Sequence, residues 1–233
     1  MSDPTPMLCI ESLSKAFTLH LRNGLRIGVL RQLDLKVYGG ECVAIAGPSG
    51  AGKSTLLRSM YGNYRADGGH IWVRHAGGLV DIASAPPRKV VEVRARTMGY
   101  VSQFLRVVPR VPAIDIVAEA AGDATPEAAR ERAAALLLGL NIPRRMHGLP
   151  PATFSGGEQQ RINLARGFIG GHPVLLLDEP TASLDAENCD IVIGMIRAAK
   201  ARGIAIVGIF HDSAMRQAVA DRTFQLVALQ DAA

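Results

Sequence analysis

Apolar and polar residues along the first half of the chain follow the patterns of short strands. Residues 33–38 alternate apolar and polar positions with period two, and residues 42–46 form a continuous apolar run followed by glycine. The pattern of residues 53–60 is that of a helix. Two further runs, 69–73 and 79–82, predict the strands of a hairpin with Gly77 and Gly78 at its turn.

The middle of the chain is predicted to be helical. Thr125 can cap a helix and Pro126 suits its first position. Apolar residues then recur at spacings of three and four on one face, namely Ala129, Ala133, Leu136, Leu137 and Leu140. This stripe predicts a helix that packs on a core.

After residue 173 the pattern becomes that of a parallel sheet with a crossover helix. We expect buried strands at 174–177 and 204–210 and a helix at about 186–202 between them. Pro and Gly clusters at 67–69, 77–78, 86–87 and 150–151 indicate short loops rather than domain linkers. The predicted fold is therefore α/β, with a helical insertion.

Composition favours one globular unit with a slight preference for anions. The 233 residues are 48% hydrophobic, and 26 Lys and Arg against 21 Asp and Glu give a net charge of +5. Three cysteines without metal-binding spacing predict reduced thiols. The N-terminal stretch lacks the features of a secretory signal, and no apolar stretch approaches the roughly 20 residues of a membrane helix. We expect a cytoplasmic chain that does not itself enter a membrane.

The strongest motif is a phosphate-binding loop between an apolar strand and a helix. Residues 47–54 match G-x-x-x-x-G-K-[ST]. Glycines let backbone N–H groups converge on an anion, the lysine reaches the β- and γ-phosphates, and the serine hydroxyl can bind Mg²⁺. The residues predicted to hold ATP here are Gly47, Pro48, Ser49, Gly50, Ala51, Gly52, Lys53, Ser54 and Thr55.

Two acids follow the apolar run 174–177. Alone, Asp178 and Glu179 could simply cap a turn, but strand ends are where parallel sheets bind ligands. Beside the phosphate-binding loop, Asp178 is expected to order the water shell of Mg²⁺. Glu179 is expected to polarise the water that attacks the γ-phosphate.

The sequence predicts a second helix start that can bind an anion, at residues 155–158. Ser155 and Glu158 form an S-x-x-E capping box around Gly156 and Gly157, in the stretch FSGGEQQR. With the phosphate-binding loop and the two acids, this stretch resembles the signature motif of ATP-binding cassette (ABC) ATPases. In that family the signature motif completes the nucleotide site of an opposing subunit.

The resemblance implies roles for further residues and covers nearly the whole chain. Gln103 matches the Q-loop that touches Mg²⁺, Asp185 lies in the D-loop match, and His211 matches the switch histidine. Phe17 stands where the family stacks an aromatic ring on adenine, although a core position explains it nearly as well. The implied fold is one ABC ATPase domain at 7–225, with a parallel sheet, an N-terminal antiparallel subdomain and a helical subdomain at about 104–168.

Stretches outside these motifs narrow the resemblance. The stretches 17–20, 22–24, 89–94, 101–110 and 206–212 look like the PhnL family, the ABC-type subunits of the bacterial phosphonate carbon–phosphorus lyase system. That resemblance implies an ATPase that acts with the other lyase-system proteins when ribose 1-phosphonate 5-triphosphate forms from ATP and a phosphonate. It also implies a second cassette as partner, either a second copy or a related subunit.

Two other functions are compatible with these motifs. The same motifs occur in the nucleotide-binding subunits of membrane transporters such as lipoprotein-release exporters, which is the alternative. A non-transport ATPase acting on nucleic acid or ribosomes, which only net charge suggests, is the weakest candidate, because such proteins usually carry two cassettes, coiled coils or zinc insertions that 233 residues leave no room for. Basic residues around Gln103 are expected to dock an acidic partner or a phosphorylated substrate, unless they form a solvated strip: Arg88, Lys89, Arg94, Arg96, Arg106 and Arg110.

Overall fold

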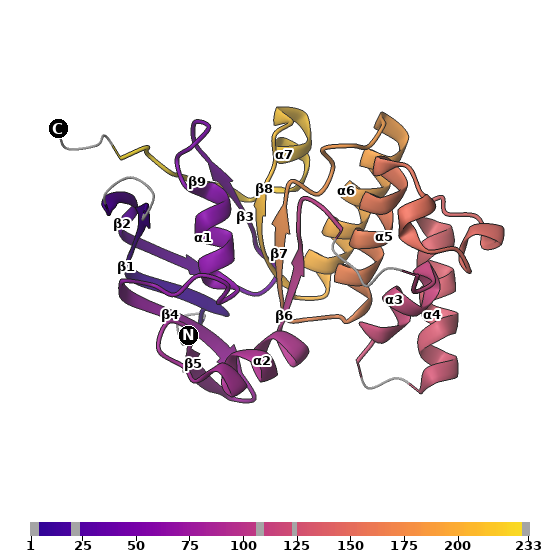
Figure 1. Ribbon diagram of the computed structural model, residues 1–233, viewed down its shortest axis with the longest axis horizontal. Coiled ribbons are helices and arrows are strands. Elements are labelled where there is room, and N and C mark those ends of the chain that lie inside the picture. Colours follow the sequence, from indigo (N-terminus) through magenta and orange to yellow (C-terminus); the bar gives the residue numbers. More distant parts are fainter. Residues whose placement is uncertain (1–4, 20–23, 106–109, 123–124, 230–233) are drawn as a thin grey trace.

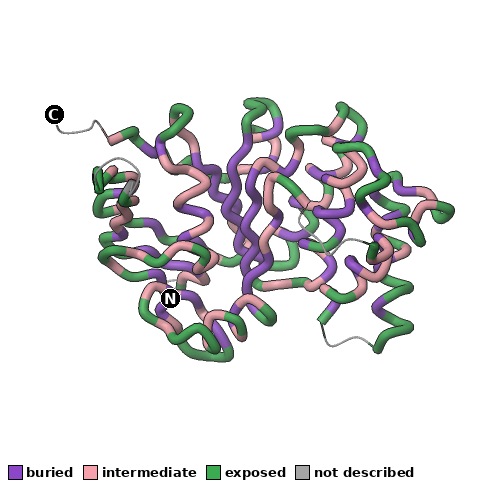
Figure 2. The backbone as a smooth tube through the Cα atoms, in the orientation of Figure 1, coloured by how far each residue is buried: buried purple, intermediate pink, exposed green. Residues whose placement is uncertain are grey.

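The computed structural model describes residues 5–19, 24–105, 110–122 and 125–229 (Figure 1). A five-stranded parallel sheet, in the order β6-β7-β8-β3-β9, runs through its centre. Figure 2 shows that the central strands form the most continuously buried part of the chain. The strands of this sheet are β3 (Cys42–Ala46), β6 (Met98–Val101), β7 (Val174–Asp178), β8 (Ala205–Ile209) and β9 (Arg222–Gln225).

A four-stranded antiparallel sheet in the order β2-β1-β4-β5 lies beside it. Its strands are β1 (Leu8–Leu19), β2 (Leu25–Val37), β4 (Gly68–His75) and β5 (Gly78–Asp81). The predicted hairpin is confirmed, with the turn at Ala76 and Gly77 because Gly78 already pairs with His75. The alternating run 33–38 forms the end of β2.

The parallel sheet separates two cores. Val174 and Leu176 of β7 face the core that contains helix α1 (Lys53–Met60), whereas Leu175 and Leu177 face the core that contains α5 (Gly156–Ile169). Successive side chains of a strand point to opposite faces, so a strand covered on both faces is apolar throughout. This explains the unbroken apolar runs in the sequence.

Helices cover the face of the parallel sheet opposite α1. α3 (Ala113–Glu119), α4 (Pro126–Gly139), α6 (Ala186–Ala201) and α7 (Ser213–Val219) all contribute to the α5 core. Thr125 caps α4 as predicted, accepting a hydrogen bond from the backbone N–H of Ala128. The predicted apolar stripe of α4 is buried except at Leu136, which is partly buried.

Some loop predictions were wrong. Pro87 was assigned to a loop, but it is the first residue of α2 (Pro87–Arg96), where a missing N–H costs nothing. Pro151 likewise begins a short 3-10 helix, Pro151–Thr153, which follows a first one at Arg144–Met146. Gly68 and Gly69 lie within β4. The predicted α/β fold, with a parallel sheet, an antiparallel N-terminal sheet and a helical part that carries the Ser-Gly-Gly stretch at the start of α5, is confirmed.

Candidate active site

The phosphate-binding loop joins β3 to α1 as predicted. Gly52 caps α1 with a left-handed φ of 91°, and a Cβ there would lie 2.7 Å from Cγ1 of Val29. Only glycine fits this turn without moving β2. The Lys53 ammonium donates to the carbonyl oxygens of Gly47 and Pro48, at 2.8 Å each. The loop therefore encloses the cation that is predicted to bind phosphate.

Asp178 lies directly beside this loop. The Ser54 hydroxyl donates to Oδ1 of Asp178 at 3.1 Å, and the Tyr100 hydroxyl donates to Oδ2 at 3.0 Å. The Asp178 residue is only 1% exposed, and burial raises the pKa of its carboxyl, an effect that the two hydrogen bonds oppose.

The donor set here suits Mg²⁺. A serine hydroxyl and one carboxylate are hard oxygen donors, and Mg²⁺ bound to a nucleotide typically needs only one or two protein carboxylates besides phosphates and water. The described residues include no cluster of three or more His, Cys, Asp or Glu side chains that could hold a metal by themselves. Ser54 and Asp178 therefore fit a metal that arrives with its nucleotide.

Three predicted catalytic side chains meet at the carboxyl edge of the parallel sheet. Gln103 follows β6, Glu179 follows β7 and His211 follows β8. The Gln103 amide donates to Oε2 of Glu179 at 2.9 Å, and Nε2 of His211 lies 2.6 Å from Oε1. Both carboxylate oxygens of Glu179 are thus held, and the backbone of this residue is left-handed, with φ of 53°. Gln103 contacts Glu179 here, and its expected contact with Mg²⁺ stays a prediction.

The predicted second anion site is a well-formed helix start. The backbone N–H and hydroxyl of Ser155 both donate to Oε2 of Glu158 at 2.8 Å, completing the capping box of α5. The hydrogen bond from the Ser155 N–H lowers the pKa of Glu158. Glu158 is therefore engaged within its own chain. Ser155 and Gly156 are exposed, so the helix start is open to a ligand.

The predicted D-loop, residues 183–185, packs directly on this helix start. A Cβ at Gly157 would lie 2.7 Å from the carbonyl oxygen of Ser183, so the D-loop backbone contacts the glycine closely. Asp185 is the N-cap of α6 and accepts a hydrogen bond from the backbone N–H of Asn188 at 2.9 Å. That bond lowers the pKa of Asp185 and gives this acid a structural role besides its predicted one.

Phe17, the candidate adenine platform, is partly buried in β1. Its ring meets Tyr64 edge-on at 5.2 Å between centroids, and the Lys15 ammonium lies 5.2 Å from its centroid. The contact with Tyr64 gives Phe17 a packing role, and its stacking on adenine stays a prediction.

The expected basic surface is smaller than the sequence suggested. Lys89 forms an ion pair with Glu92, and Arg94 donates to the backbone oxygen of Tyr61 and to the side chain of Asn63. Arg106 lies outside the described residues. The exposed members of the set that the structure describes are Arg88, Arg96 and Arg110.

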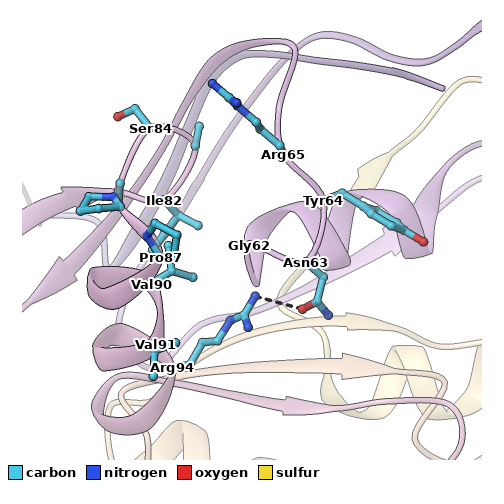
Figure 3. A pocket seen from close by; sticks show the side chains of 13 residues that line it. Gly62, Asn63, Tyr64, Arg65, Ile82, Ser84, Pro87, Val90, Val91 and Arg94 are labelled. Atoms are coloured by element: carbon cyan, nitrogen blue, oxygen red, sulfur yellow. Dashed lines mark hydrogen bonds between the residues drawn. The ribbon is translucent and has the colours of Figure 1, made fainter. Parts of the chain in front are cut away.

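Gln103 lines one of two neighbouring cavities, and sequence reasoning missed most of the lining of both. One, of about 460 Å³, is lined by Arg58, Tyr100, Gln103 and Phe104 among others. The second, of about 580 Å³, lies between the loop after α1 and helix α2 (Figure 3). Asn63 and Tyr64 line both cavities.

No motif in the sequence signals the contact between Tyr100 and Asp178, because this contact depends on the register of β6 and β7. Tyr100 pairs in register with Leu176, two residues before Asp178. The parallel strand ends therefore bring the phenol to the acid.

Comparisons with known proteins identify the family. The family model described as "ABC transporter" matches residues 30–182. Macrolide export ATP-binding/permease proteins MacB are 33% identical over 97% of this chain in Brucella abortus and 35% identical over 79% in Escherichia coli. The chain covers 33% and 28% of their lengths, so it spans about a third of these relatives.

Solved structures share the fold. A dimeric ATP-binding cassette in a post-hydrolysis state, bound to ADP and phosphate, superposes with a TM-score of 0.86 at 24% identity. The superposition covers 96% of this chain and 97% of the other.

The names of the sequence relatives refer to macrolide export and not to phosphonate cleavage, so the narrower resemblance to PhnL gains no support here. On the family match over residues 30–182, the chain belongs to the ABC transporter ATPase family.

Proposed function

We propose that this chain is an ATP-hydrolysing cassette that works in pairs and drives a partner complex. The observation that carries the proposal is the position of Glu179. Its carboxylate is held by Gln103 and His211, while the neighbouring Asp178 is bound to Ser54 of the phosphate-binding loop. A carboxylate fixed in this way can orient a water molecule and accept its proton.

The remaining chemistry is positioning and charge stabilisation. Lys53 can exchange its two carbonyl partners for the phosphates of ATP, because both carbonyls are its own loop backbone. His211 is exposed at 67% of its side chain and can reach a γ-phosphate beside Glu179. When bound, Mg²⁺ would neutralise phosphate charge next to Ser54 and Asp178.

In this proposal, one chain provides only half of the residues that surround each nucleotide, and a second cassette provides the rest. α1 and α5 pack on opposite faces of the parallel sheet (Figure 1), so the helix start at Ser155 does not reach the loop before α1 of the same chain. A second cassette facing the first would bring Ser155, Gly156 and Gly157 over the nucleotide of its neighbour.

The comparisons support a membrane permease as the partner complex. The curated relatives are ATP-binding/permease proteins at least three times as long as the aligned region, which favours the transporter alternative over the lyase hypothesis. None of the described helices is long and apolar enough to span a bilayer, so the permease would have to be supplied by sequence outside them. A phosphonate lyase complex is the second candidate, supported by the PhnL-like stretches, which include residues 89–94 of α2.

The variant Glu179→Gln tests the proposed ATPase. We expect it to keep ATP affinity and lose hydrolysis by at least a hundredfold, because the amide cannot accept a proton from water. Hydrolysis is measured as phosphate release and ATP affinity by calorimetry. Hydrolysis near the unaltered rate would contradict the role of Glu179.

The same variant, tagged and purified from its native cell with ATP and Mg²⁺, separates the two partner classes. Co-elution of a permease only when detergent is present would support the transporter. Co-elution of lyase-pathway proteins without detergent would support the second candidate.

A further inference from the structure

A column of stacked side chains connects the cavity wall to the acid beside the phosphate-binding loop. The Arg94 guanidinium lies over the Tyr61 ring at 4.6 Å from its centroid, and Tyr61 stacks on Tyr100 at 5.0 Å with 24° between the ring planes. The three residues come from α2, the end of α1 and β6. The column therefore joins three elements by side-chain stacking, and its last member, Tyr100, contacts Asp178.

The column ends on one specific atom. The Tyr100 hydroxyl donates to Oδ2 of Asp178, while Ser54 donates to Oδ1. Asp178 is buried, so water cannot replace a lost donor easily, and each of its oxygens is assigned to one partner. The phenol and the serine thus each hold one carboxylate oxygen of Asp178.

We propose that Tyr100 is a positioning residue that fixes the Asp178 carboxylate for Mg²⁺ through its hydroxyl, with Tyr61 and Arg94 holding the phenol ring in place. This rests on the proposed function, because it assumes that a metal–nucleotide complex binds at Ser54. Hydrogen bonds to a metal-binding carboxylate typically set its orientation, and their loss costs tenfold to a hundredfold in metal affinity.

The stack explains how a hydroxyl can be held so accurately. A phenol hydroxyl lies at the end of a ring that can swing, so its position depends on what packs on the ring faces. Tyr61 covers one face of Tyr100, and Arg94 covers Tyr61 in turn. Figure 3 shows Arg94 at the wall of the larger cavity, with its hydrogen bond to Asn63 drawn. Its second bond, to the backbone oxygen of Tyr61, fixes the far end of the column.

Tyr61, which stacks on Tyr100, provides a matched control. Tyr100→Phe and Tyr61→Phe each remove one hydroxyl from the same stack and leave both rings. The Tyr61 hydroxyl makes no hydrogen bond within the part of the chain that the structure describes, whereas that of Tyr100 bonds to Asp178. A difference between the two variants therefore reports the contacts of the Tyr100 hydroxyl, with Asp178 and with Arg58, and not damage to the stack.

The experiment measures metal binding without hydrolysis. Mn²⁺ is titrated into each full-length protein saturated with ADP, and free Mn²⁺ is counted by electron paramagnetic resonance. ADP affinity is measured separately in EDTA. We expect Tyr100→Phe to raise the Mn²⁺ dissociation constant by about tenfold, Tyr61→Phe to leave it unchanged, and both to keep the metal-free ADP affinity of the unaltered protein.

Three results would overturn the inference. They are an unchanged Mn²⁺ affinity in Tyr100→Phe, an equal loss in both variants, or a parallel loss of metal-free ADP affinity, which would mean general damage to the site. Failure of the proposed function is seen separately, because the unaltered protein would then bind neither ADP nor Mn²⁺ with ADP.

Discussion

Gly157, in the first turn of α5, lies in close contact with the backbone of the predicted D-loop. A Cβ at this position would lie 2.7 Å from the carbonyl oxygen of Ser183, whereas a Cβ at the neighbouring Gly156 would meet nothing within 4 Å. The contact is with backbone, so a methyl group there would have to move the chain before α6. Overpacking of this kind typically costs about 1–3 kcal/mol.

We therefore expect Gly157→Ala to lower the Tm by several degrees and Gly156→Ala to leave it nearly unchanged. For a chain of this size, about 1 kcal/mol corresponds to roughly 2–4 °C. Thermal unfolding of the two variants without nucleotide measures this, because no composite site contributes under those conditions. Equal Tm values in both variants would mean that the D-loop moves aside without cost.

The candidate site could be predicted residue by residue only where a motif fixes the chemistry. The phosphate-binding loop, Asp178 and Glu179 occur at set spacings, and the structure brings Gln103 and His211 to Glu179. Tyr100 was missed because an aromatic residue at a strand end has the same pattern as a core residue. Its role depends on the register between β6 and β7, whose paired residues Met98 and Val174 are 76 positions apart, and no local pattern contains that register.

At the scale of elements, α2 is joined to the antiparallel sheet by a buried histidine. Nδ1 of His75 lies 2.6 Å from the Thr97 hydroxyl, and Nε2 lies 2.9 Å from Oε1 of Glu92 on α2. Lys89 donates to the other oxygen of Glu92 at 3.0 Å. The hydrogen bonds from His75 and Lys89 lower the pKa of Glu92 from 4.5 to about 2.

The lowered pKa of Glu92 determines how the stability of the fold changes with pH. A carboxyl whose pKa is lower in the folded state stabilises the fold above its unfolded pKa, and the contribution is lost as the pH falls through its folded pKa. We expect Glu92→Gln to lower the Tm at pH 7 and the difference from the unaltered protein to shrink as the pH falls from 4.5 toward 2. Thermal unfolding is followed from pH 7 down to the lowest pH at which the protein still folds.

Glu131→Gln on α4 is the control for charge alone. This exposed residue makes no ion pair with the residues that the structure describes. Its variant should match the unaltered protein at every pH. A Tm difference for Glu92→Gln that stayed constant with pH would show that the ionised carboxylate is not what joins α2 to β4.

A helix could be predicted from the sequence where the spacing of its apolar residues agreed with the residues that begin it. The α4 helix has a cap, a proline at its first position and a regular apolar stripe, and all three are found in the structure. The α2 helix was missed because its paired prolines at 86 and 87 resemble a loop, and because it buries only Val93 completely. A helix that covers a sheet edge through polar contacts has too narrow an apolar face to reveal its period.

At the scale of the whole molecule, the two predicted anion sites cannot serve one nucleotide in one chain. The loop before α1 and the start of α5 belong to elements on opposite faces of the parallel sheet. Each site is open on its own, and the proposed pair of cassettes would close both. Nucleotide would then hold the pair together, and hydrolysis would release it.

The variant Glu179→Gln makes this proposed pairing measurable, because ATP that cannot be cleaved remains as the bridge. We expect it to elute as a monomer of 24.8 kDa without nucleotide and at twice that mass with ATP and Mg²⁺. Adding Ser155→Ala should abolish the dimer, since the second chain then loses a donor to the nucleotide. Adding Thr125→Ala instead removes the N-cap of α4, at the same cost of about 1 kcal/mol, and should leave the dimer intact. If ATP binds and the protein stays monomeric, the homodimer is contradicted, and a different cassette must supply the opposing Ser-Gly-Gly helix start.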